Sequence, residues 1–262
     1  MEAYKRFYRQ AVLSYKGLFG FLNPRTYLLV MILNPLSQLL FFSMLASHIY
    51  GKEELAGYIA ANALLLCVMS SVFGMMSVVM SDRGMGTLPL VMATPFNKAL
   101  LFFSRSVPHI VNGIFTAFIG LLFGIVLFKV PISLSVMPFL LCIWLVSIFS
   151  ACGLGLIIAS CSLWTSSMHL ISNLIASLLL LVSGANYALS VLPGWLAGVA
   201  EVFPLTRGVH LTKAIVNEAD SSAFIRLLTE EFLLGVLLFM LGLLGIKLAE
   251  YLARKKGSVE LS

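Results

Sequence analysis

The chain has 262 residues, of which 60% are hydrophobic and only 11% are charged, and its mean hydropathy is +1.01. Soluble domains use about 45–50% apolar and about 25% charged residues. A soluble fold of this size has too few polar side chains here to cover its surface. The composition therefore excludes an ordinary soluble protein and indicates an integral membrane protein.

Stretches without Asp, Glu, Lys or Arg mark the candidate membrane spans, because a helix needs about 20 apolar residues to cross the bilayer. Three such intervals are long enough for one helix each, and a fourth, 130–200, is long enough for two because the polar run 161–167 divides it. A last apolar stretch, 232–246, continues past Lys247, whose side chain can reach the interface. We therefore predict an all-α integral membrane protein with six transmembrane helices. The predicted spans are residues 26–50, 56–80, 106–128, 136–160, 166–188 and 229–251.

The distribution of basic residues predicts the orientation, because Lys and Arg are retained in cytoplasmic segments. Most of the 17 basic residues fall in the segments assigned to the inner side, whereas the outer loops, to which we assign Glu230 and Glu231, hold most of the acids. Both termini are therefore predicted to be cytoplasmic, in a multi-pass protein. The basic excess is explained by orientation and by contact with anionic lipid, which argues against nucleic acid as a partner. The inner basic residues are Lys5, Arg6, Arg9, Lys16, Arg25, Arg83, Lys98, Arg105, Lys247, Arg254, Lys255 and Lys256.

Residues 1–22 have the pattern of an interfacial amphipathic helix. Aromatic and aliphatic side chains recur at a period of 3.6 residues on one face, and basic side chains occupy the other. This composition is typical of helices that lie on a membrane surface. A role as a lipid anchor alone and an additional contact with a cytoplasmic partner both remain open.

The segment 81–98 is too long for a tight turn and too apolar for a solvated linker. Leu88, Leu90, Val91 and Met92 have no reason to face the cytosol unless another protein covers them. Exposed apolar patches usually mark binding surfaces. We interpret the segment as a docking helix for a cytoplasmic protein, and the alternative is burial of these side chains against the bundle.

The segment between the fifth and sixth spans contains short apolar pieces separated by Pro and Gly. Each piece is well below spanning length, so we predict short re-entrant outer helices within residues 190–216. Irregular backbone at membrane depth must be surrounded by protein or line a wet cavity. We therefore interpret this segment as a structure that covers the outer end of a substrate pathway. The alternative is an ordinary amphipathic outer loop. The candidate outer-gate residues are Gly184, Pro193, Trp195 and Pro204.

Polar side chains inside the predicted spans have two interpretations. They can line a substrate path, or they can bond a neighbouring helix, since an amide in lipid needs a partner. A path with few fixed charges and several aromatic rings suits an amphipathic or lipid-linked substrate. The candidate path residues are Asn34, Gln38, Phe41, Asn62, Asn173 and Tyr187.

Several kinds of chemistry are absent from the sequence. It has no G-x-x-x-x-G-K-[ST] phosphate loop, no H-E-x-x-H motif and no G-x-S-x-G motif. No acidic residue lies within the charge-free stretches, which argues against a proton-driven carrier. The four cysteines lack C-x-x-C spacing, so no metal site is predicted. An energy source, if one is used, must therefore lie in another chain.

Two groups of short motifs resemble those of ABC-2 type permeases. The first is Arg83-Gly84-Met85-Gly86-Thr87-Leu88 followed by Ala93-Thr94-Pro95, and it is similar to the family's coupling region. The second is Ser183-Gly184, then Leu192-Pro193-Gly194-Trp195, then Pro204-Leu205-Thr206-Arg207, and it is similar to the region before the last helix. With the six-span plan, the resemblance covers almost the whole chain.

The resemblance implies the membrane subunit of an ATP-driven exporter in a prokaryotic-type plasma membrane. It implies a dimer of permease subunits, either a homodimer or a related heterodimer, bound to two copies of a cytoplasmic ATPase that holds ATP and Mg. Family members export drugs, antibiotics, peptides or glycans. The alternatives from other classes are a membrane-embedded lipid-modifying enzyme and an ATP-independent carrier. By the resemblance, the ATPase-coupling residues are Arg83, Gly84, Gly86, Thr87, Leu88, Leu90, Thr94 and Pro95.

Overall fold

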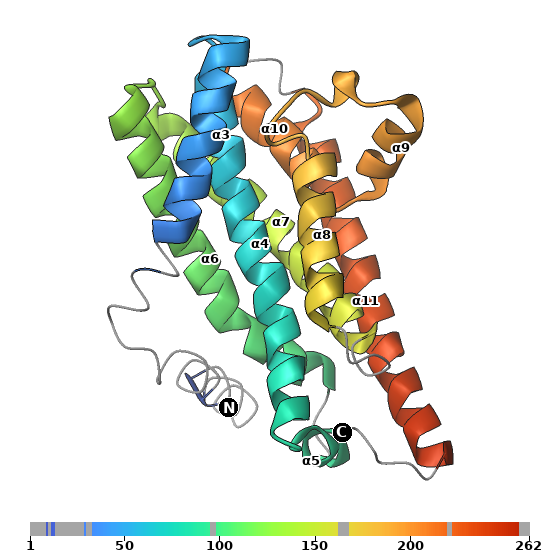
Figure 1. Cartoon of the computed structure of the whole chain (residues 1–262). Coiled ribbons are helices and arrows are strands. Elements are labelled where there is room, and N and C mark those ends of the chain that lie inside the picture. The colour runs from blue at the N-terminus through green and yellow to red at the C-terminus, as the bar shows by residue number, and fades with distance from the viewer. Residues whose placement is uncertain are drawn as a thin grey trace.

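The computed structural model describes residues 33–94, 98–161, 168–218 and 222–256, together with residues 9, 12, 13 and 29. Within these residues every regular element is a helix (Figure 1). The predicted interfacial helix, residues 1–22, lies almost entirely outside them. The longer helices are α3 (Asn34–Tyr50), α4 (Leu55–Gly84), α6 (Lys98–Phe128), α7 (Met137–Cys161), α8 (Met168–Val182) and α11 (Phe224–Lys256). The shorter ones are α5 (Leu88–Ala93), η2 (Leu134–Val136), η3 (Leu189–Val191), α9 (Gly194–Val202) and α10 (Thr206–Val216).

Four stretches of helix are long and apolar enough to cross a membrane: Leu55–Gly84, Phe103–Phe128, Leu134–Cys161 and Phe224–Ala249. The prediction of an all-α, multi-pass membrane protein is thus confirmed for the described residues. α3 and α8 occupy two further predicted spans, but they have 17 and 15 residues. The count of six spans therefore stays a prediction.

α4 is the central helix of the bundle. It packs against α3, α6, α7, α8 and α10, and its buried residues run almost without a break from Leu55 to Val79. A helix that is apolar on every side is one that neighbours surround on every side. α6 and α11 instead leave large apolar side chains such as Val126 and Leu237 exposed on the outside of the bundle, as lipid contact requires.

α7 and α11 approach each other closely at a seam of small residues. A Cβ on Gly153 would lie 2.8 Å from the backbone nitrogen of Phe239, and one on Gly235 would lie 3.0 Å from Cα of Ser150. On the other side of α7, a Cβ on Gly155 would lie 2.8 Å from the carbonyl oxygen of Val72 in α4. These glycines bring α4, α7 and α11 to backbone contact, as small residues do between helices in membranes.

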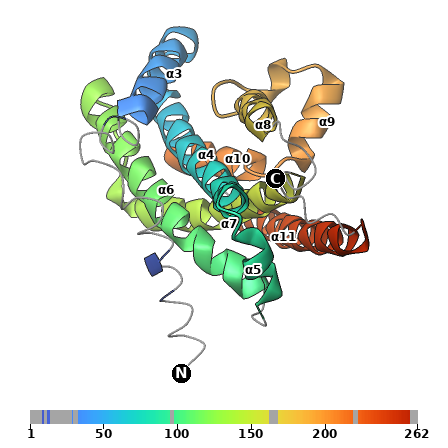
Figure 2. The ribbon, with the colours of Figure 1, turned by 60° about the horizontal axis from the view of Figure 1, so that its bottom comes forward.

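The predicted coupling and outer segments lie at opposite ends of the bundle. Figure 1 shows α5 close to the C-terminal end of α11, and the α3–α4 turn, α9 and α10 at the other end. Figure 2 shows α4 between α3 and α8 at the centre of the packing. α9 and α10 are short helices, as predicted for residues 190–216, whereas their depth in a membrane stays a prediction.

One expectation about the last span is wrong. α11 begins at Phe224, so Glu230 and Glu231 lie inside the helix and inside the apolar stretch Phe224–Ala249 rather than in an outer loop. Glu231 is fully buried. The search for charge-free stretches failed to predict the start of this helix because it takes no account of hydrogen-bond partners on other helices. Here α7 and α10 supply such partners to the Glu231 carboxylate.

The fifth helix ends earlier than predicted. α8 stops at Val182, and Gly184 adopts a left-handed conformation with φ of 70°. A left-handed glycine ends a helix without the steric cost that other residues meet. The residues up to Tyr187 therefore belong to the outer connection and not to the span.

The seam predicts a stability difference between two identical substitutions. Gly153→Ala places a methyl group against the backbone of α11 and should destabilise the protein by about 1–3 kcal/mol, as overpacking does. Gly198→Ala, in α9, meets nothing within 4 Å and should be neutral or slightly stabilising. The stability of both variants is measured by thermal unfolding in detergent, monitored by the reaction of the buried thiols of Cys67 and Cys152 with a labelling reagent. Equal unfolding temperatures for the two variants would contradict the seam.

Candidate functional site

A left-handed turn separates α4 from α5. Gly86 has φ of 66°, the Thr87 amide donates to the Asp82 carbonyl oxygen at 2.9 Å, and the Gly86 amide donates to the Arg83 carbonyl oxygen at 3.0 Å. This pair of bonds is a Schellman motif, in which glycine is strongly favoured at the left-handed position. Gly86 is therefore required by the backbone. Gly84 has no positive φ and nothing within 4 Å of a built Cβ, so its identity is not fixed by the fold.

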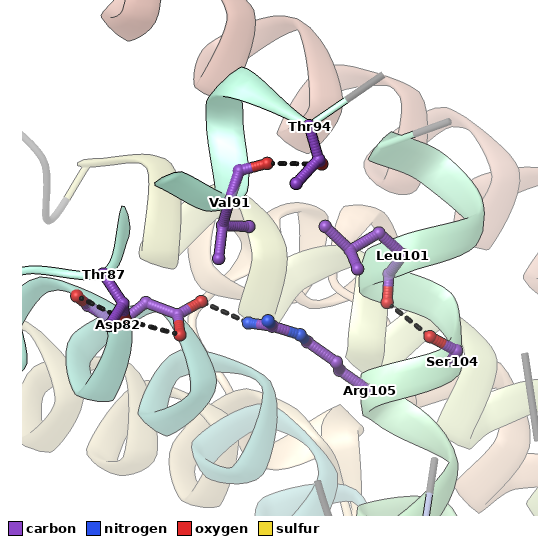
Figure 3. Close-up of polar contacts among 7 residues, drawn as sticks. All are labelled: Asp82, Thr87, Val91, Thr94, Leu101, Ser104 and Arg105. Carbon is purple, nitrogen blue, oxygen red and sulfur yellow. Dashed lines mark hydrogen bonds and ion pairs between the residues drawn. The ribbon is translucent and has the colours of Figure 1, made fainter. Parts of the chain in front are cut away.

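Asp82 connects this turn to α6. Its carboxylate pairs with the guanidinium of Arg105, and it also accepts from the Thr87 hydroxyl at 3.3 Å (Figure 3). The two charged side chains are only 18% and 13% exposed, so solvent screens the pair less than it screens a surface ion pair. The entry of the chain into α5 is thus held to two long helices.

α5 is a single short helix whose ends follow from its sequence. Pro89 lies in its first turn, where no amide donor is needed. Thr94 is extended, with ψ of 141°, as a residue before proline prefers, and its hydroxyl donates to the Val91 carbonyl oxygen (Figure 3). Pro95 itself lies outside the described residues.

The two leucines of α5 have opposite environments. Leu88 is 2% exposed and packs with apolar residues of three long helices, whereas Leu90 is 69% exposed. For Leu88 the alternative interpretation, burial against the bundle, is therefore correct, and the expectation of a docking contact is wrong. Leu90 on α5 and Met85 in the turn before it, which is 70% exposed, are apolar side chains of this segment that remain open. The other buried members of the cluster that contains Leu88 are Met75, Val79, Leu156, Ala159 and Ile246.

The predicted path residues are spread over α3, α4, α8 and the outer connection. Asn62 is buried and donates to the Tyr58 carbonyl oxygen of its own helix at 3.0 Å. Phe41 is 62% exposed, and Asn173 is exposed on α8. Gln38 and Tyr187 are partly buried, and the side chain of Asn34 is outside the description. Among the described contacts no hydrogen bond joins any two of these residues, so a path along them stays a prediction.

The outer connection is tied to the bundle by Lys213 of α10. Its ammonium donates to the Gly184 carbonyl oxygen at 2.7 Å and lies 3.5 Å from the centre of the Tyr58 ring. Tyr58 in turn stacks on Tyr50 at the end of α3. Burial lowers the pKa of Lys213 from its usual value to about 7, and Glu54 opposes that shift. Helices α3, α4 and α10 therefore meet at one polar cluster.

The other predicted gate residues have different environments. Pro193 precedes α9 and Trp195, in its first turn, is 72% exposed. Pro204 is buried between α9 and α10. Gly184 is joined to α10, because its carbonyl oxygen accepts from the Lys213 ammonium. The structure thus places all four in the outer segment, while a gating role stays a prediction.

Sequence reasoning missed two charged residues that the fold encloses at this end of the bundle: Lys213 of α10, which is partly buried, and Glu231 of α11, which is fully buried. Both were assigned to loops because they interrupt apolar stretches. The available signal was the run 203–216, where a periodic apolar pattern predicts a helix whose single lysine must find a partner on one face. Within the part of the chain that the structure describes, no group of three His, Cys, Asp or Glu side chains could hold a metal ion.

Comparison with known protein families matches residues 11–216 to the ABC-2 type transporter family. This match covers more than half of the chain and includes α3 to α10. The chain belongs to the ABC-2 type transporter family. A comparison with curated proteins gives no match. Members of the ABC-2 family are permease subunits of ABC transporters, so the chain is a transport subunit and not itself an enzyme.

The residues matched to the ABC-2 family include elements at both ends of the bundle. α5 and the outer segment with α9 and α10 both lie within the matched residues, whereas α11 lies beyond them. ABC-2 permeases normally work with an ATPase subunit. The exposed surface of Met85 and Leu90 is therefore the part of this permease to examine for contact with such a subunit.

The two leucines of α5 yield a matched pair of substitutions. Leu88→Ala removes a buried side chain and should cost about 2–5 kcal/mol of stability. Leu90→Ala changes an exposed one and should lie within about 0.5 kcal/mol of the wild type. Thermal unfolding of the purified permease in detergent compares them. If the two variants unfold at the same temperature, the assignment of Leu88 to the core is contradicted.

Proposed function

We propose that the chain is the membrane-spanning permease subunit of an ATP-binding cassette exporter that moves an amphipathic or lipid-linked substrate out of the cytoplasm. ATP and Mg bind to a separate cytoplasmic ATPase, present in two copies. The observation that carries the proposal is α5, a short helix that exposes Leu90 while its neighbour Leu88 is anchored in the bundle. The membership of the chain in the ABC-2 family supports the same function.

The contacts of α5 support its role in transmitting movement. Leu88 packs on α4, α7 and α11, and Asp82 joins the same turn to Arg105 of α6. A force applied at Leu90 therefore reaches four long helices through contacts that are short and buried. Closely packed elements transmit displacement because interiors are not compressible. A flexible loop at this position would absorb the displacement.

The proposed assembly contains a second permease subunit. α3 exposes Phe41, Met44 and Ile49, and α8 exposes Leu170 and Leu174. Both helices flank α4 on the side opposite α7 (Figure 2). These apolar faces fit contact with lipid or with a second copy, either identical or related. The orientation with α5 on the cytoplasmic side follows from the positive-inside rule.

The first test is purification of this chain from its native membrane in mild detergent, followed by mass spectrometry. The proposal predicts that an ATPase with a phosphate-loop motif is recovered in stoichiometric amount. Leu90→Asp should reduce that recovery about tenfold, since loss of one apolar contact of an interface costs about 1.4 kcal/mol, a factor of about ten in affinity. Leu134→Asp changes another exposed leucine, 84% exposed at the opposite end, and should leave the recovery unchanged.

Two results would count against the proposal. A preparation without ATPase would favour an ATP-independent carrier or a lipid-modifying enzyme. Equal loss of the ATPase in the two leucine variants would show that the charge harms the protein generally and that α5 is not the docking element. Unfolding temperatures of both variants separate these cases from simple misfolding.

A further inference from the structure

A buried carboxylate joins three helices at the outer end of the bundle. Glu231 of α11 is 0% exposed. Its Oε1 atom accepts from the Ser150 hydroxyl of α7 at 2.5 Å and from the Leu205 amide, at the start of α10, at 2.8 Å. A buried carboxylate without such donors carries a large desolvation cost. Glu231 therefore depends on α7 and α10, and they in turn depend on it.

The Leu205 amide is an unusual donor. Leu205 has φ of 87°, in the left-handed region that residues with a Cβ avoid, and its side chain is fully buried. Such a conformation persists only where surrounding contacts determine it. It directs the amide at Glu231 and starts α10 at the next residue, Thr206.

Around Glu231, α10 and α11 each lie close to α7 at a glycine. A Cβ on Gly208 would lie 2.2 Å from the Ser147 hydroxyl oxygen, so α10 touches α7 one turn from Ser150. A Cβ on Gly235 would lie 3.0 Å from Cα of Ser150, so α11 touches α7 one turn from Glu231. The carboxylate is thus surrounded by the close contacts of three helices.

The neighbouring charges are largely engaged with one another. Arg207 donates through Nε to Glu230 at 3.2 Å, and Arg226 lies 3.4 Å from the same carboxylate. Both hydrogen bonds of Glu231, in contrast, come from uncharged groups. An acceptor oxygen, rather than a charge, is what these two donors require.

We propose that Glu231 is a positioning residue that fixes the start of α10 to the α7–α11 pair, so that α10 moves with that pair as one unit. It acts through the acceptor capacity of Oε1. The positional part of this inference stands on the contacts above, and its part in transport rests on the proposed function. Glu231 lies outside residues 11–216, the part of the chain that the family match covers.

Hydrogen–deuterium exchange of the full chain in lipid nanodiscs tests this inference at the Leu205 amide. Glu231→Leu removes the acceptor and should speed exchange in the peptide covering residues 205–212 about tenfold, as loss of a buried hydrogen bond to a charged group does. Glu231→Gln keeps one acceptor oxygen and should stay within about twofold of the wild type. Glu201→Gln, which changes an exposed acid of α9, is the control and should exchange as the wild type does.

A second substitution keeps the test valid if Glu231→Leu does not fold. Ser150→Ala leaves the acceptor in place and removes only the α7 donor, so exchange in residues 205–212 should rise about threefold, with peptides of α4 unchanged. Wild-type exchange in both Glu231→Leu and Ser150→Ala would overturn the inference. Exchange in Glu231→Gln as fast as in Glu231→Leu would also overturn it, in favour of a role for the charge or its proton.

These outcomes are independent of the ATPase. α11 begins at the end of the bundle opposite α5, and Glu231 lies near that N-terminal end of α11 (Figure 1). Glu231→Leu should therefore retain full recovery of the ATPase, while Leu90→Asp should retain slow exchange at residues 205–212. A failure of one proposal can be distinguished from a failure of the other.

Discussion

Close backbone approach between α4, α7 and α11 is the constraint on which the other contacts of this protein depend. In a bilayer, apolar surface gains little by leaving lipid for another helix, so association relies on packing and on hydrogen bonds. Gly153, Gly155 and Gly235 permit that packing because each meets the backbone of a neighbouring helix. Larger residues at these positions would hold the helices apart. Leu88 at one end of the bundle and Glu231 at the other would then lose their partners on neighbouring helices.

The elements proposed to act in transport are both attached to this three-helix unit. At one end Leu88 is buried among side chains of α4, α7 and α11, which leaves Leu90 exposed beside it. At the other end Glu231 of α11 holds the first turn of α10 to α7. α6 joins through the ion pair of Arg105 with Asp82. Within the described residues, packed contacts of α4, α7 and α11 thus join α5 at one end to the outer segment at the other.

The membrane character and most helix positions could be predicted from the sequence, because the bilayer excludes unpaired charge and sets a minimum span length. Phe128 and Tyr50, for example, end helices where the charge-free stretches predict. The method failed at Glu231, since burial of that acid depends on an amide donor from Leu205, which is distant in sequence. Charge placement identifies spans well only where each charge lacks a buried partner.

The segment 81–98 is predicted to be the coupling region, but the sequence does not separate its residues by their environment in the fold. A six-residue helix has too few turns for a periodic pattern to show which leucine faces the bundle, so Leu88 and Leu90 looked alike. Gly84 and Gly86 looked alike as well, although only Gly86 has a positive φ. Tertiary packing and backbone conformation, which the sequence does not display, distinguish the members of each pair.

The most direct test of the account is site-specific photo-crosslinking in native membranes, with a photoreactive residue in place of Leu90 or of Leu134. Both leucines are exposed, but they lie at opposite ends of the bundle. The account predicts an adduct with a phosphate-loop ATPase from position 90 and none from position 134. An adduct from position 134, or a failure of position 90 to reach any ATPase, would contradict the claim that α5 couples this permease to ATP hydrolysis.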